Sequence, residues 1–207
     1  GNNAAINFCD LSLDRGVPSV SVISPPDKPV SPALATISTA VFYLSEPAYV
    51  SISIKDNGGT PVNNLQAAVL QPLGDFSMVW DGKNGAQAAV SDGGYIYEIT
   101  VADLADNQSS KTGDIFVDSA PPAAPTVDLM SSATNRQVQV VAGLAEGGSK
   151  VEILRGGVVA GRGAAGNDGR FSLEIDLGDG DNLIAVRDVD AAGNTGPQSA
   201  VQTVRFE

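Results

Sequence analysis

The chain has 207 residues, of which 43% are hydrophobic and only 17% charged, and its 23 glycines and 12 prolines favour short strands joined by turns over helices. Its net charge of −12 argues against nucleic-acid binding, because such a surface has no basic stripe to displace counterions from phosphates. The chain contains no histidine, which excludes Ser-His and Cys-His nucleophile pairs and His-ligated metals, so we do not expect an enzyme.

The N-terminal segment, residues 1–16, carries no clear element, although the apolar side chains in 6–13 are compatible with a short strand. Such a strand, without a partner in its own domain, could add to the open edge of a neighbouring subunit and build a filament. The alternative is a leader that is disordered or packs on its own domain. Cys9 is the only cysteine, which excludes an intrachain disulfide and a cysteine-based zinc site.

Residues 17–118 show the alternation and turn signals of a first β-domain. Val50, Ile52 and Ile54 alternate with polar residues and are expected to point inward. The Asn-Gly-Gly sequence that follows, at 57–59, predicts a hairpin turn. The expected strands number seven, as in an Ig-like sandwich, and cover 17–23, 37–44, 49–54, 61–70, 75–80, 95–101 and 112–117.

Residues 119–125 separate this domain from a second one with the same pattern. Three prolines within this segment predict a stiff, extended linker, because proline cannot occupy a central strand. The second domain, 126–207, has expected strands at 126–129, 137–141, 150–154, 158–161, 171–175, 183–186 and 200–206. The predicted fold is therefore all-β, with two tandem seven-strand antiparallel Ig-like (fibronectin type III-like) β-sandwiches.

Both domains contain the sequence Asp-x-Ala-(Asp/Gly)-Asn directly after a strand, at 103–107 and at 190–194. The spacing of the two copies matches the length of one small β-sandwich domain, which supports an internal repeat. In an Ig-like domain this turn lies at the pole where the chain enters. The second copy is therefore expected to face the linker.

The second copy is a candidate calcium site, because calcium binds six to eight hard oxygen ligands such as carboxylates and carbonyls. The candidate ligands are Asp118 at the end of the first domain, together with Asp188, Asp190 and Asn194. The alternative is a purely structural Asx-type turn, in which Asp and Asn accept local backbone N–H bonds and Gly193 takes a positive φ. The first copy lacks that glycine and a second upstream aspartate, so it is the weaker candidate.

Trp80, Tyr95 and Tyr97 are open to two interpretations. The three rings could form a platform on which a sugar stacks. A single tryptophan before Asp-Gly in a sandwich more often packs into the core, and strand alternation places the two tyrosines on one face.

Residues 30–118 resemble the Ig-like domain of the bacterial flagellar hook-capping protein, which also occurs in many secreted bacterial proteins. The resemblance rests on 43–54, on Trp80-Asp81-Gly82 and on Gly94-Tyr95-Ile96-Tyr97. Residues 122–207 are similar to the Ig-like repeats of bacterial surface adhesins and biofilm proteins. The markers there are the sequences at 141–143, 167–171, 181–184 and 190–194. The resemblance implies a stalk or an adhesive repeat on a bacterial surface.

We therefore expect a non-catalytic structural or adhesion module that is secreted or displayed on the cell surface. Its expected partners are other protein domains or surface components of the same assembly, with neither nucleic acid nor membrane insertion, and with calcium as the only cofactor considered. No apolar run approaches the roughly 18 residues that a membrane span needs. Two alternatives remain open: an accessory carbohydrate- or substrate-binding region of a larger secreted enzyme, and a self-associating filament subunit that uses the N-terminal strand.

Overall fold

The computed structural model describes residues 15–207, and within them the fold is all-β, as predicted. The only helical element of the described chain is a single 3₁₀ turn, η1 (Pro32–Leu34). The strand predicted within 6–13 and the cysteine at position 9 lie outside the described residues.

Two compact units make up the described chain, and each takes in more than one stretch of sequence. Unit 1 holds residues 15–25, Ala40–Met78 and Ile96–Gly113, and unit 2 holds Pro26–Thr39, Val79–Tyr95 and Asp114–Glu207. No helix of the described residues is long and apolar enough to cross a membrane.

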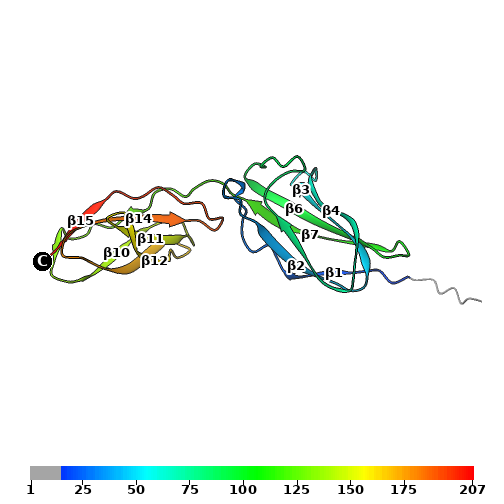
Figure 1. Ribbon diagram of the computed structural model, residues 1–207, viewed down its shortest axis with the longest axis horizontal. Helices are drawn as coiled ribbons and strands as arrows, with labels where there is room; N and C mark the ends of the chain where they lie inside the picture. The colour runs from blue at the N-terminus through cyan, green and yellow to red at the C-terminus, as the bar shows by residue number, and fades with distance from the viewer. Residues whose placement is uncertain (1–14) are drawn as a thin grey trace, which may run out of the picture. The chain divides into compact units, whose positions relative to one another are not determined.

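Two sheets are built from the strands that precede the proline-rich segment (Figure 1). One has the order β1-β2-β5 and the other the order β4-β3-β6-β7. β1 pairs with β2, and β3 with β4, in antiparallel register interrupted by bulges. The bounds are β1 (Val20–Ser24), β2 (Ser38–Leu44), β3 (Ala48–Asp56), β4 (Pro61–Gln71), β5 (Gly74–Trp80), β6 (Gly93–Ala102) and β7 (Gln108–Val117).

Unit 1 buries aromatic side chains between these two sheets. Phe42 of β2 is fully buried, and its ring stacks on Phe76 of β5 with centroids 5.5 Å apart. The ring of Tyr97, on β6 in the opposite sheet, meets Phe42 edge-on at the same centroid distance. Val50, Ile52 and Ile54 of β3 are buried as their alternation predicts. Burial of apolar side chains such as these is the dominant stabilising term in a domain of this kind.

The strands that follow the proline-rich segment form a second pair of sheets, with the orders β13-β10-β8 and β12-β11-β14-β15-β9. The bounds are β8 (Thr126–Val127), β9 (Ala133–Thr134), β10 (Val138–Leu144), β11 (Lys150–Arg155), β12 (Val158–Ala164), β13 (Arg170–Asp176), β14 (Gly180–Val189) and β15 (Gln202–Phe206). The element β9 is additional to the seven strands predicted here. It has two residues and pairs in parallel with β15, so a distant partner defines it and local alternation does not reveal it.

The core of this part of unit 2 lies between its two sheets. It consists of Val141, Val151, Ile153, Ala165, Phe171, Ile175, Leu177, Ile184, Val186 and Val204. These side chains come from both sheets of the pair, and burial of an aliphatic side chain of this size contributes about 1.5–3 kcal/mol. The alternating pattern of β13, in which Phe171 and Ile175 point inward, follows from the two-residue period of a strand.

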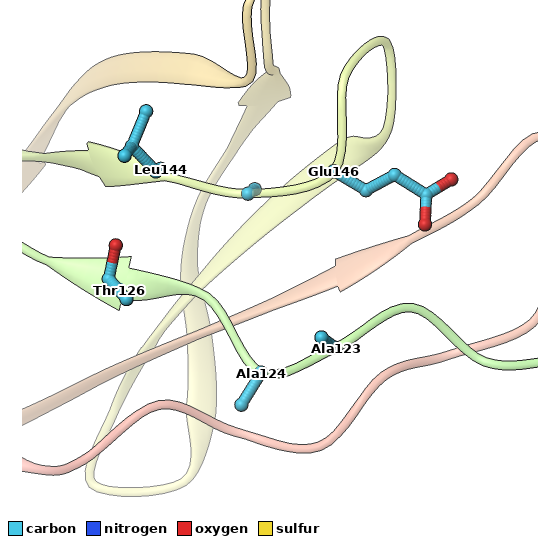
Figure 2. Close-up of a pocket in the computed structure, with 6 residues that line it drawn as sticks. Ala123, Ala124, Thr126, Leu144 and Glu146 are labelled. Carbon is cyan, nitrogen blue, oxygen red and sulfur yellow. The ribbon is translucent and has the colours of Figure 1, made fainter.

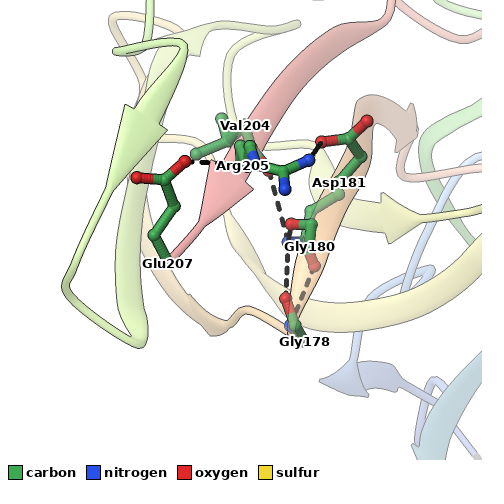
Figure 3. A network of polar contacts seen from close by, with 7 residues as sticks. Gly178, Gly180, Asp181, Val204, Arg205 and Glu207 are labelled. Atoms are coloured by element: carbon green, nitrogen blue, oxygen red, sulfur yellow. Dashed lines mark hydrogen bonds and ion pairs between the residues drawn. The ribbon is translucent and has the colours of Figure 1, made fainter.

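A buried asparagine fixes the turn that joins β13 to β14 (Figure 3). The side-chain amide of Asn182 donates to the carbonyls of Gly178, Gly180 and Val204, and its oxygen accepts from the Gly178 amide. Arg205 of β15 pairs with both Asp181 and Glu207 nearby at the exposed surface. The side chain of Asn182 thus provides hydrogen-bond partners for backbone groups of this turn.

Candidate functional site

The turn at 103–107 is closed by its own aspartate and asparagine. The Asp103 amide donates to the Asn107 carbonyl at 3.1 Å. The Asp103 carboxylate accepts from the amides of Ala105 and Asn107 and from the Asn107 side chain, at 2.8–2.9 Å. The hydrogen bond from the Asn107 side chain, reinforced by the two amides, lowers the pKa of Asp103 from its usual 3.8.

The turn at 190–194 repeats this geometry. The Asp190 amide donates to the Asn194 carbonyl at 3.1 Å, and the two oxygens of the Asp190 carboxylate accept from the Asn194 amide and side chain at 2.8 Å each. Gly193 has φ 97°, and the matching residue of the first turn, Asp106, has φ 64°. The two copies therefore share one backbone shape, although only the second uses the glycine that this shape favours.

Asn194 has two further partners, Ser31 and Asp118. Its side-chain oxygen accepts from the Ser31 hydroxyl at 2.7 Å, and its side-chain nitrogen donates to the Asp118 carbonyl at 2.9 Å. All these residues belong to unit 2, and Asn194 is 4% exposed. The structure therefore brings three of the four candidate calcium ligands, Asp118, Asp190 and Asn194, together. Asp190 and Asn194 use their side-chain oxygens for hydrogen bonds within this network.

Asp188, the fourth candidate, is different. The residue is fully buried, and its Oδ2 accepts from the Glu146 amide at 3.0 Å and from the Ser149 hydroxyl at 3.4 Å. Its Oδ1 is buried and has no hydrogen-bond partner. Such an oxygen is rare in folded proteins, because an unsatisfied buried polar group costs about 1–3 kcal/mol.

Glu146 is the neighbour that sequence reasoning missed. It begins the sequence Glu146-Gly147-Gly148, and nothing local indicates that its amide meets a side chain on β14. Partial loss of solvent raises the pKa of Glu146 above its usual 4.5, and the charges of Asp190, Asp188 and Asp118 raise it further. No ion pair between described residues involves Glu146 or these three aspartates. Glu146, Asp118, Asp188 and Asp190 therefore form a cluster of negative charge.

Glu146 also borders an open pocket of about 400 Å³ (Figure 2). The other residues that line it are small or apolar: Ala123, Ala124, Thr126, Leu144 and Ala145. Within residues 15–207, no three Asp, Glu, His or Cys side chains form a ready-made group that could hold a metal ion. Any cation here would need backbone or water oxygens besides the carboxylates.

Trp80 belongs to the core, as the second of its two interpretations predicted. It is 1% exposed, and its indole nitrogen donates to the Lys83 carbonyl at 2.9 Å. The ring of Tyr95 meets it edge-on with centroids 5.2 Å apart, and Tyr97 is buried beside Phe42. A ring with no free face cannot stack on a sugar, so Trp80 is not a binding platform.

Comparison with protein-family models accounts for both halves of the chain. Residues 32–105 match the model described as the FlgD Ig-like domain. Residues 121–204 match the model described as the bacterial Ig domain. The chain carries two bacterial Ig-like domains in tandem. Both lie in the order that the sequence motifs predicted.

Among solved structures, the chain is similar to the fibronectin(III)-like modules of CbhA from Clostridium thermocellum, with 13% identity, coverage of 91% of this chain and 94% of that one, and a TM-score of 0.48. A 1.5-MDa bacterial ice-binding adhesin shares 15% identity, with coverage of 94% and 67% and a TM-score of 0.42. The Yersinia pseudotuberculosis adhesin InvE shares 14% identity, with coverage of 93% and 61% and a TM-score of 0.35. A search of curated proteins finds no match.

Proposed function

We propose that this chain is a non-catalytic structural or adhesion module that works outside the cell or on its surface. The observation that carries the proposal is the tandem arrangement of two bacterial Ig-like domains. Domains of this kind are rigid sandwiches whose usual use is to space, assemble or present surfaces. The location and the role are inferred from this class of domain.

The chemistry of the polar residues supports a non-catalytic role. The aspartates and asparagines of the two matching turns spend their hydrogen-bonding capacity on closing those turns. The chain also contains no histidine that could serve as a general base near neutral pH. We propose other protein domains or surface components as the partners, because the acidic surface disfavours nucleic acid and anionic lipid.

We further propose that the folding domains follow the sequence, as 17–118 and 126–207 with a linker at 119–125. The sheet topology supports this division, because within the described residues β1 to β7 share sheets only with one another, and β8 to β15 do the same. Separate expression of 17–118 and 126–207 tests the boundary. Each segment is expected to unfold cooperatively, and a segment that stays unfolded would overturn the division.

Neither alternative gains support. The carbohydrate-binding reading depended on an accessible Trp80, and that ring is buried. The filament reading depends on a strand within 6–13, which lies outside the described residues.

A replacement experiment in the producing cell tests the proposed role. One strain would lack the segment 17–207, and a second would carry an unrelated Ig-like pair of equal length in its place. A spacer predicts that attachment or surface assembly falls on deletion and returns with the replacement. An adhesive module predicts that the replacement fails to restore it. No change on deletion would contradict both forms of the proposal, and loss of an enzymatic activity would contradict its non-catalytic part.

A further inference from the structure

We propose that Asp188, Glu146 and the backbone carbonyl of Pro122 bind a calcium ion in unit 2. The starting point is the buried Oδ1 of Asp188, the only buried side-chain oxygen or nitrogen in the described chain without a hydrogen-bond partner. A buried carboxylate without a positive partner is costly, because its lost hydration is not replaced. A bound cation would be the partner that Asp188 Oδ1 lacks among the described residues.

A second oxygen points to the same place. A Cβ added at Gly196 would lie 2.8 Å from Asp188 Oδ1 and 2.7 Å from the Pro122 carbonyl oxygen. Asp188 Oδ1 and the Pro122 carbonyl oxygen therefore both lie against the backbone of Gly196, where any larger residue would crowd them. The backbone of Gly196 is itself fixed there, since its amide donates to the Asp188 carbonyl at 2.9 Å. Both oxygens are hard ligands of the type that calcium prefers.

Glu146 supplies the second carboxylate. Its backbone amide already bonds to Asp188 Oδ2, so its side chain starts beside the same carboxylate. Figure 2 shows that side chain extending away from Leu144 and the other pocket-lining residues. The residue is exposed, so its side chain is free to turn toward an ion. The negative charge of Asp118 also acts on Glu146, and the Asp118 carboxylate already accepts from the Ala120 amide at 3.1 Å.

The charge balance favours a cation over a buried water molecule. A water could bond to Asp188 Oδ1 and to the Pro122 carbonyl, but it would leave the negative charges of the cluster uncompensated. Calcium compensates them and accepts a mixed, flexible set of carboxylate, carbonyl and water oxygens. In this assignment Asp190 and Asn194 hold the turn and do not coordinate the ion, since their side-chain oxygens already have partners.

The test uses the full chain, dialysed against a chelator and then titrated with calcium chloride. Calorimetric titration should show one site, with affinity in the range of about 0.1–1 mM that is common for extracellular modules. In differential scanning calorimetry, about 10 mM calcium should raise the Tm of one unfolding transition by several degrees relative to sodium chloride of equal ionic strength. Asp188→Asn should abolish this rise, and Glu146→Gln should weaken the affinity at least about fivefold. Asp181→Asn, which removes an exposed carboxylate outside the cluster, should leave both the rise in Tm and the calcium affinity unchanged.

Two results would overturn the proposal. One is a wild-type chain whose melting and titration do not respond to calcium, which would leave a buried water as the partner of Asp188. The other is a calcium response in Asp188→Asn as large as that of the wild type, which would place the ion elsewhere. If Asp188→Asn does not fold, Glu146→Gln decides alone, and an affinity equal to that of the wild type then overturns the assignment. The result is independent of the proposed surface role, because it concerns the isolated chain.

Discussion

The two matching turns allow a paired test of what the additional hydrogen bonds of Asn194 contribute. Asn194→Ala removes the bond to Asp190, the bond to the Asp118 carbonyl and the bond accepted from the Ser31 hydroxyl. Asn107→Ala removes the equivalent of the first of these, the bond to Asp103. The backbone bonds of both turns are retained, so each variant reports on side-chain contributions.

The structure gives the expected size of the difference. A net hydrogen bond contributes about 1 kcal/mol, and a buried partner left unsatisfied costs about 1–3 kcal/mol. Asn194→Ala should therefore lower the free energy of unfolding of its domain by about 3 kcal/mol. For a domain of this size, that corresponds to a fall in Tm on the order of 10 °C or more. Asn107→Ala leaves the bonds to Ser31 and to the Asp118 carbonyl in place and should therefore cost less.

Denaturant unfolding of the full chain, followed by far-UV circular dichroism, and scanning calorimetry of each variant measure these values. Asn194→Asp is the matched control, because it keeps the oxygen that accepts from Ser31 but removes both donated bonds. It should be about as damaging as the alanine variant, since it also places a second carboxylate beside Asp190. Equal losses for Asn194→Ala and Asn107→Ala would show that the bonds to Ser31 and to the Asp118 carbonyl add no stability.

Four further outcomes are expected. Phe42→Ala should cost about 3–5 kcal/mol, whereas Phe116→Ala, on a side chain 53% exposed, should cost far less; similar losses would contradict the described core. Asp106→Gly should stabilise the chain by about 0.5–1 kcal/mol, because relief of the positive φ exceeds the added chain entropy, and a loss of stability would argue against that conformation. Because hydrogen bonds hold the pKa of Asp103 below 3.8, its stabilising contribution is present above that pH and lost as the pH falls below it; Asp103→Asn should remove this acid dependence from the unfolding free energy. The pKa of Glu146 is raised above 4.5, so without calcium its ionisation lowers stability as the pH rises through that range, and a Glu146→Gln chain that kept this loss would contradict the assignment.

The sequence predicted the strands well because their burial pattern is local. Alternation at Val50, Ile52 and Ile54 and the hairpin turn that follows them depend only on neighbouring residues. The two-residue strand β9 was missed because only its distant partner β15 defines it. The bulges between β3 and β4 were likewise not expected, since bulges follow from pairing between strands.

The candidate site shows the same division between local and distant causes. The shared shape of the two turns could be predicted from their Asp and Asn residues, which bond within five positions of the chain. That Asp188 would be fully buried with one oxygen unpaired could not be predicted. Its burial depends on packing against the loop that carries Glu146 and Ser149, which lies about forty residues earlier in the sequence.

Surface labelling of intact producing cells tests whether this chain works outside the cell or on its surface. An antibody raised against residues 17–207 would be applied to cells before and after permeabilisation, with a cytoplasmic protein as the control for leakage. A module that works outside the cell or on its surface predicts labelling of intact cells, or recovery of the chain from the medium. Labelling that appears only after permeabilisation, together with no chain in the medium, would contradict the proposed function.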